Sequence, residues 1–174
     1  SEDIPHKTEA GAVLLNLNTE QEVAKAYSEV KINGEKFAPT SAGSPVVVQE
    51  MVTGIVETLV GVSHDPQFGP VIAFGIGGIF IELFDDLALR ICPITEIDAR
   101  EMIEEIRGHQ LLTGFRGSQQ SDVESIISTL VAVSTMAATL SDKAIDLDIN
   151  PLIVLPNKQG VKAVDVLLRF GQCD

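Results

Sequence analysis

The sequence has no tryptophan, and aromatic residues make up only 5% of its 174 residues. Its two cysteines, Cys92 and Cys173, are too few for a disulfide framework, which is typical of a reducing compartment. Lysine and arginine number 12 against 25 aspartates and glutamates, so the formal net charge is -13. A field of this sign disfavours nucleic acid and anionic membranes as partners. No apolar run reaches the ~18 residues of a membrane span and no signal peptide is visible, so we expect a cytoplasmic protein.

The residues that are abundant indicate a globular domain with an aliphatic core. Hydrophobic residues account for 45% of the sequence, which excludes a disordered chain. At this length a folded chain buries roughly 70% of its unfolded surface. We therefore expect a single domain over residues 1–174, with a core of Val, Ile, Leu and Ala. Because the chain is acidic, a nucleotide site must be assembled locally from backbone amides, a few cations and metal ions.

Short apolar runs, bounded by Gly, Pro or Asn, predict a β-sheet. The expected strands cover 12–18, 46–52, 54–63, 68–74, 87–92, 145–149, 152–155 and 161–168. Short turns between many of these runs favour antiparallel pairing. Because helices and strands do not alternate strictly, the fold class is α+β, with a mostly antiparallel sheet flanked by helices.

Three helices are expected from apolar periodicity and from signals at their ends. They cover residues 19–33, 95–108 and 121–140. Thr19 with Glu22, and Ser121 with Glu124, have the spacing of a capping box. Asn33-Gly34 is expected to end the first helix.

A glycine cluster follows one predicted strand. Gly75, Gly77 and Gly78 lie in the segment FGIGGIF, where glycine amides can approach and bind a phosphate. The spacing is neither a Rossmann nor a P-loop fingerprint. Such glycines more often belong to a plain turn or bulge, and both interpretations stay open on the residues alone.

Acidic residues near the C-terminal end predict a metal site. Asp148 and Asn150 are two apart on a predicted strand, so their side chains share one face. Asp165 comes from a later predicted strand. Two carboxylates and an amide oxygen are ligands that suit Mg²⁺ together with phosphate oxygens. The alternative is a solvated edge of an acidic protein.

Two further segments have weaker chemical signals. His6 lies beside Lys7 in a loop that ends at Gly11, where it could bind or accept phosphate, although most loop histidines are simply solvated. The run VVVQEMV ends near Glu50, and Glu57 follows soon after. Such a strand could offer backbone atoms to a purine and a carboxylate to a ribose, or be an ordinary sheet strand.

Taken in order, IPHKTEAGAV, VQEMV, GVSHDPQFGPVIAFGIGGIFIEL and DLDINPLIVL with the later AVD resemble one family. It is the ATP-grasp subunit or domain of ADP-forming (NDP-forming) acyl-CoA synthetases, a relative of the succinyl-CoA synthetase β-subunit. The resemblance covers essentially the whole chain and is most specific over residues 61–82. It implies an ATP-grasp fold and the reversible conversion of acyl-CoA, ADP and phosphate into acid, ATP and CoA. It also implies that phosphate passes through phosphohistidines.

The resemblance assigns a role to each candidate residue. His6 matches the catalytic histidine of the ATP-grasp part. Glu50, Met51 and Val52 match the adenine-binding segment, and Glu57 a contact at or near the ribose. The remaining implied residues are Gly75, Gly77, Gly78, Arg90 and Arg116 for the phosphates of ATP or ADP, and Asp148, Asn150 and Asp165 for Mg²⁺.

The sequence also departs from the family pattern. Ala12 stands at the second glycine of the family's GG pair, and Asp146 at the usual glutamate before the final motif. The family's first strand-and-helix unit, with its phosphate-contacting lysine, is missing from this sequence. The CoA-binding and ligase domains that bind the acyl-CoA substrate are missing too. We therefore expect a part of a longer protein that is inactive in isolation, with exposed apolar patches and self-association as a homo-oligomer.

Two alternatives to a ligase part stay open. The first is a degenerate ATP-grasp domain that regulates a fused acetyltransferase without ligase turnover, which Ala12 and Asp146 favour slightly. The second is an acidic α+β interaction domain with no small ligand.

Overall fold

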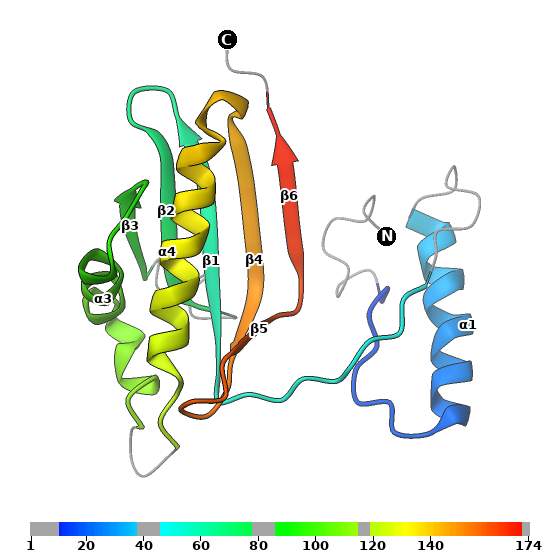
Figure 1. Cartoon of the computed structure of the whole chain (residues 1–174). Coiled ribbons are helices and arrows are strands. Elements are labelled where there is room, and N and C mark those ends of the chain that lie inside the picture. Colours follow the sequence, from blue (N-terminus) through cyan, green and yellow to red (C-terminus); the bar gives the residue numbers. More distant parts are fainter. Residues whose placement is uncertain (1–10, 38–45, 78–85, 115–118, 172–174) are drawn as a thin grey trace. The chain divides into compact units, whose positions relative to one another are not determined.

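The structure is a computed structural model that describes residues 11–37, 46–77, 86–114 and 119–171 (Figure 1). The chain divides into two compact units, Ser1–Met51 and Val52–Asp174. The helices are α1 (Glu20–Phe37), α3 (Glu96–Glu105), α4 (Val123–Thr139) and the short 3-10 helices η1 (Arg107–Leu111) and η3 (Ser141–Lys143). The strands are β1 (Val56–Asp65), β2 (Gly69–Ile76), β3 (Leu87–Ile91), β4 (Ile145–Val154), β5 (Val161–Ala163) and β6 (Val166–Phe170). Among these helices, none is long and apolar enough to cross a membrane.

Helix α1 of the unit Ser1–Met51 begins where the sequence predicts. The Glu22 N–H donates to Thr19 Oγ1 at 3.2 Å, and the Glu22 carboxylate accepts from the Thr19 N–H at 3.0 Å, so the capping box is confirmed. The predicted end at Asn33-Gly34 is wrong, because α1 continues through both residues to Phe37. A glycine inside a helix costs only about 1 kcal/mol. The Asn33 side chain also donates to the Gly11 carbonyl at 3.0 Å.

Two predicted strands are not found. Residues 12–18 and 46–52 have no strand structure. An apolar run signals a preference for burial, but a strand also needs a neighbour to complete its ladder of hydrogen bonds. Among the described residues, neither segment pairs with another strand.

The unit Val52–Asp174 is built on an antiparallel sheet. Its strand order is β3-β2-β1-β4-β5, and β6 also pairs with β4. Helices α3 and α4 lie against one face of the sheet (Figure 1). The α+β class and the mostly antiparallel sheet flanked by helices are thus confirmed.

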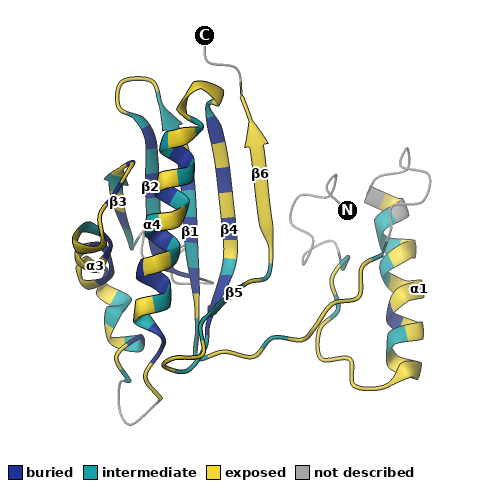
Figure 2. Ribbon diagram, in the orientation of Figure 1, coloured by how far each residue is buried: buried dark blue, intermediate teal, exposed yellow. Residues whose placement is uncertain are grey.

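Alternation along the strands decides which residues face the helices. Val60, Ile72 and Phe74 are fully buried, and they pack in one core with Leu130 of α4 and Met102 of α3. Burying each such side chain contributes about 1.5–3 kcal/mol. We call this side of the sheet the helix-covered face, and the other side the open face. Figure 2 shows buried and exposed residues alternating along the first part of β4, whereas β6 is exposed throughout.

The helix starts of this unit depend on side-chain caps. At α3, Thr95 and Asp98 form a reciprocal capping box, with Thr95 N–H to Asp98 Oδ2 at 2.7 Å. At α4 the cap is Asp122, whose carboxylate accepts from the Ser125 N–H at 3.2 Å. The predicted capping box of Ser121 and Glu124 is therefore wrong by one residue. Ser121 instead forms a β-bridge to Pro156, which takes it out of the cap position.

Strand β4 is continuous, whereas the sequence predicts two strands there. Its register against β1 shifts between Val60↔Ile149 and Thr58↔Leu152. Two residues of β4, Asn150 and Pro151, therefore face one residue of β1, which is a β-bulge. This extra residue lets the apolar residues before and after the bulge face the helices. The predicted strand 161–168 is in fact two strands, β5 and β6.

Candidate functional site

The candidate metal ligands come together on the open face of the sheet. Against β4, the register of β6 (Ile149↔Val166) continues unbroken into that of β5 (Leu152↔Ala163). This register places Asn150 directly opposite Asp165, and the Asn150 N–H donates to the Asp165 carbonyl at 3.1 Å. We call Asp148, Asn150 and Asp165 the acidic corner.

Asp148 completes the acidic corner from the same strand as Asn150. The two residues are exposed and alternate with the buried Leu147 and Ile149. The pKa of the Asp148 carboxyl is raised, chiefly because this group is partly withdrawn from solvent although the residue as a whole is exposed. The nearby charges of Asp146 and Asp165 raise it further. A cation bound here would relieve this repulsion.

The acidic corner fits a divalent cation that also binds phosphate. Among the described residues, no group of three or more His, Cys, Asp or Glu could hold a metal ion. The acidic corner has only two carboxylates, and its third candidate ligand is the amide of Asn150. It is therefore not a cluster made only of His, Cys, Asp and Glu. Three hard oxygen donors, completed by phosphate oxygens and water, match the preference of Mg²⁺. The donor set is therefore suitable for Mg²⁺ with a nucleotide.

The described glycines of the FGIGGIF segment have a packing role. A Cβ on Gly75 would lie 2.8 Å from the Asp86 carbonyl oxygen, and one on Gly77 would lie 3.2 Å from the backbone of Glu57. The Gly77 N–H also donates to the Glu57 carbonyl at 2.7 Å. Close backbone approach thus explains both residues. The Gly77 N–H is therefore already hydrogen-bonded to the protein backbone.

The residues implied for the adenosine part have separate positions. Glu50 and Met51 are exposed at the end of the unit Ser1–Met51, and Val52 begins the next unit. Glu57 is exposed on β1, at a position opposite Ile153 of β4. The predicted segment 50–52 therefore spans the junction between the two units along the chain.

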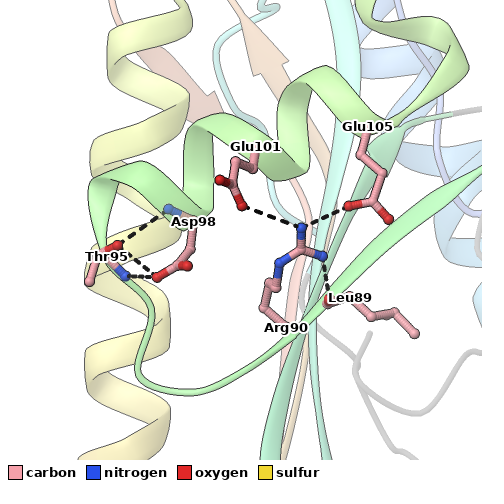
Figure 3. A network of polar contacts seen from close by, with 6 residues as sticks. All are labelled: Leu89, Arg90, Thr95, Asp98, Glu101 and Glu105. Carbon is pink, nitrogen blue, oxygen red and sulfur yellow. Dashed lines mark hydrogen bonds and ion pairs between the residues drawn. The ribbon is translucent and has the colours of Figure 1, made fainter.

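Arg90 lies in a different environment from the acidic corner. It pairs across the sheet with the buried Ile72, so its side chain is on the helix-covered face. There its guanidinium contacts two carboxylates of α3, Glu105 at 2.8 Å and Glu101 at 4.0 Å. It also donates to the Leu89 carbonyl at 2.8 Å (Figure 3). These contacts give Arg90 a role in attaching α3 to the edge of the sheet, and they separate it from Asp148 and Asn150.

Three candidate residues, His6, Gly78 and Arg116, lie outside the described residues. Their roles stay predictions.

Two aspartates that the sequence analysis passed over hold the loops of this unit. The Asp86 carboxylate accepts from the N–H groups of Arg107 and Gly108, both at 2.9 Å, at the start of η1. The Asp122 carboxylate accepts from the Gly160 N–H at 2.8 Å as well as capping α4. The only signal in the sequence is the preference of aspartate for helix starts, which also fits Ser121.

The fold defines the class of protein, an α+β domain with a mostly antiparallel sheet flanked by helices. The sequence matches the family described as the ATP-grasp domain over residues 1–170. The chain therefore belongs to the ATP-grasp domain family. Within that family it is similar to the β parts of ADP-forming acid–CoA ligases, as its relatives show.

Two relatives illustrate this similarity. The chain is 39% identical to the β subunit of acetate–CoA ligase (ADP-forming) II of Pyrococcus furiosus, over 95% of this chain and 70% of the relative. It is 37% identical to acetate–CoA ligase (ADP-forming) I of Archaeoglobus fulgidus, over 99% of this chain. There it spans only 24% of the relative's length.

Solved structures agree in fold. The dinucleotide-forming acetyl-CoA synthetase 1 of Candidatus Korarchaeum cryptofilum, in complex with coenzyme A and Ca-AMPCP, superposes with a TM-score of 0.88 at 39% identity. The match covers 95% of this chain and 71% of that one. A second structure of that protein holds Mg-AMPPCP, with a phosphohistidine segment that points towards the nucleotide site (TM-score 0.82, 38% identity). That match covers 98% of this chain and 73% of the other.

Proposed function

We propose that this chain is the nucleotide-binding part of an ADP-forming acyl-CoA synthetase. The whole enzyme would convert acyl-CoA, ADP and phosphate into the free acid, ATP and CoA, reversibly. The observation that carries the proposal is the acidic corner. The Asn150 N–H donates to the carbonyl of Asp165, which lies between β5 and β6, and Asp148 is on the same face as Asn150, in a chain 39% identical to an acetate–CoA ligase subunit.

The acidic corner would hold Mg²⁺ and so orient the phosphates of ATP or ADP. Phosphoryl transfer depends mainly on positioning and on neutralising charge, and Mg²⁺ supplies the neutralisation when it is bound. In a chain of net charge -13, local cations are needed because the background field repels a nucleotide. Asp148, Asn150 and Asp165 would contribute oxygen atoms, and the open face leaves them accessible.

The other predicted residues would complete the nucleotide site. We propose that Glu50, Met51 and Val52 bind the adenine and that Glu57 contacts the ribose. Gly75, Gly77, Gly78 and Arg116 would lie near the phosphates. Their support is the resemblance of the segments that contain them to this family.

His6 would carry the phosphoryl group between this chain and its partner. A neutral imidazole nitrogen attacks the γ-phosphorus, a nitrogen–phosphorus bond forms, and the bond to the ADP oxygen breaks. The phosphoryl group then passes to the CoA-binding and ligase domains, which bind the acyl-CoA substrate in the same chain or in a partner subunit. Relatives of both organisations occur, since one is a separate β subunit and another is far longer than this chain. The enzyme would act in the cytoplasm, and it could form a homo-oligomer.

The test is phosphoryl transfer in the full-length protein. ATP labelled on the γ-phosphate should label the wild type and fail to label a His6→Asn variant. Equal labelling of both proteins would overturn the role of His6. A Lys7→Gln variant is the matched control, because it changes the next residue in the sequence but keeps the imidazole.

A second measurement separates the ligase from the regulatory alternative. Formation of ATP from ADP and phosphate should depend on acyl-CoA. If ATP never forms with any of several short-chain and aromatic acyl-CoA compounds, the ligase proposal fails. The relatives named above are ligases, so they do not favour a regulatory domain.

A further inference from the structure

The acidic corner lies at the one place where β4 changes its register against β1. Asn150 and Pro151 there face the single residue Leu59. The position of this β-bulge decides which residue points to the open face, because a shift by one residue turns a side chain to the opposite face. If the bulge moved along β4 towards Ile145, Asn150 would fall opposite Val60 and turn to the helix-covered face, away from the metal ligands of the open face. Something must therefore fix the bulge in place.

Thr58 is the polar side chain nearest to the bulge on the helix-covered face. It is fully buried, as are Val60 on the same strand and Val154 on β4. Its hydroxyl donates to the carbonyl of Leu152, the residue that follows the bulge, at 2.9 Å. A hydroxyl in an otherwise aliphatic layer is costly to bury unless it is bonded. Valine would fill nearly the same volume. What threonine adds at this position is the hydroxyl group that donates the hydrogen bond.

We propose that Thr58 is a positioning residue for the acidic corner. Its hydroxyl holds Leu152 opposite Thr58 and so keeps the extra residue of β4 at Asn150-Pro151. Asn150 is then presented to the open face beside Asp165. Thr58 does not touch the cation or the nucleotide, and acts through the backbone of β4. This inference rests on the proposed function, because it assumes that the corner binds a divalent cation.

Three variants distinguish positioning from plain core stability. Thr58→Val keeps the volume and removes the donor, while Thr58→Ser keeps the donor and removes a methyl group. Ser134→Ala is the matched control, since Ser134 is also fully buried and its hydroxyl is bonded in the same core. That hydroxyl donates to the Val131 carbonyl at 2.9 Å and accepts from the Ile94 N–H at 3.2 Å.

The experiment measures Mn²⁺ affinity by electron paramagnetic resonance in the full-length protein, with AMPPCP as the nucleotide. Circular dichroism selects a temperature at which every variant is folded. We expect Thr58→Val to weaken Mn²⁺ binding about tenfold, the low end for residues that support metal ligands. Thr58→Ser should bind within about twofold of the wild type, as should Ser134→Ala.

Each other outcome overturns the inference in a recognisable way. Equal Mn²⁺ affinity in the wild type and Thr58→Val would remove the role of Thr58 and leave the acidic corner intact. An equal loss in Ser134→Ala would show general loosening of the core. Absence of Mn²⁺ binding in the wild type would overturn the metal site itself, and the positioning role with it.

Discussion

The two faces of the sheet in the unit Val52–Asp174 contain different kinds of residue, although the same strands supply both. On the helix-covered face, Ile72 and Phe74 are fully buried. On the open face, Asp148 and Asn150 are exposed, and Leu89 is 55% exposed. The comparison teaches that one face determines stability and the other is accessible to a ligand. Substitutions on each of the two faces test this division.

The largest effect is expected in the core. Phe74→Ala should lower the free energy of unfolding by about 3–5 kcal/mol, because it removes a fully buried ring and leaves a cavity. Leu89→Ala, on the open face of the neighbouring strand, should change it by less than about 0.5 kcal/mol. Urea denaturation of both variants measures the difference. Similar losses would mean that the open face is covered in solution.

The next effect concerns activity and leaves stability unchanged. Asp148→Asn should reduce kcat/KM for ATP formation at least about 100-fold, because it weakens a metal ligand. The free energy of unfolding should not fall, because partial withdrawal from solvent, and then the charges of Asp146 and Asp165, already disfavour the charge at this position. Asp146→Asn is the control on the same strand and face, with an expected loss below threefold. If both substitutions reduced kcat/KM equally, the activity would depend on the net charge of this face and not on Asp148 as a metal ligand.

A smaller effect is expected at the cap of α4. Asp122→Ala should cost about 1–2 kcal/mol, typical of a lost N-cap. The Gly160 N–H is the main reason that the pKa of Asp122 is lowered, and the Ser125 N–H contributes to it. A carboxylate with a lowered folded-state pKa stabilises the fold above its unfolded pKa of about 4, and this stabilisation is lost as the pH falls through the folded pKa.

The stability difference between wild type and Asp122→Ala should therefore shrink below about pH 4. Urea titrations at pH 7 and at pH 3 measure this change. A difference that stays constant with pH would show that the side chain acts without its charge.

The smallest effect is expected at Arg90. Arg90→Gln should cost about 0.2–1 kcal/mol, because its ion pairs with α3 are partly exposed to solvent. Nucleotide affinity, measured by calorimetry with Mg·ATP, should stay the same since Arg90 faces the helices. A tenfold loss of affinity at unchanged stability would instead place Arg90 in the nucleotide site and break the division between the faces.

Much of the sheet was predictable because its residues alternate. The strands that became β1, β2 and β3 were expected within two or three residues of their observed bounds. The sequence could not reveal that 12–18 and 46–52 have no pairing neighbour among the described residues, since that depends on distant segments. Nor could it reveal that α1 passes through Asn33-Gly34, because the Asn33 side chain reaches Gly11, 22 residues away in the sequence.

The candidate site was predictable in part. Spacing alone placed Asp148 and Asn150 on one face, and the observed exposures agree. The opposition of Asn150 and Asp165 needed the strand register. Arg90 shows the limit of an inference from a family segment, because only the pairing with Ile72 reveals which face it occupies. For Gly75 and Gly77, close packing against Asp86 and Glu57 is invisible without the fold.

The bulge of β4 also has a consequence for how this domain can change in length during evolution. Its extra residue is accommodated on the side of β1 alone, because β5 and β6, although separate strands, pair with β4 in one common register. Deletion of Pro151 in a related sequence would remove the bulge between β4 and β1. It would also shift the pairing of β4 with β5 and β6 by one residue. A second deletion near Val164, on the facing strand, would restore both. We therefore expect insertions and deletions at these two positions to occur together among related sequences.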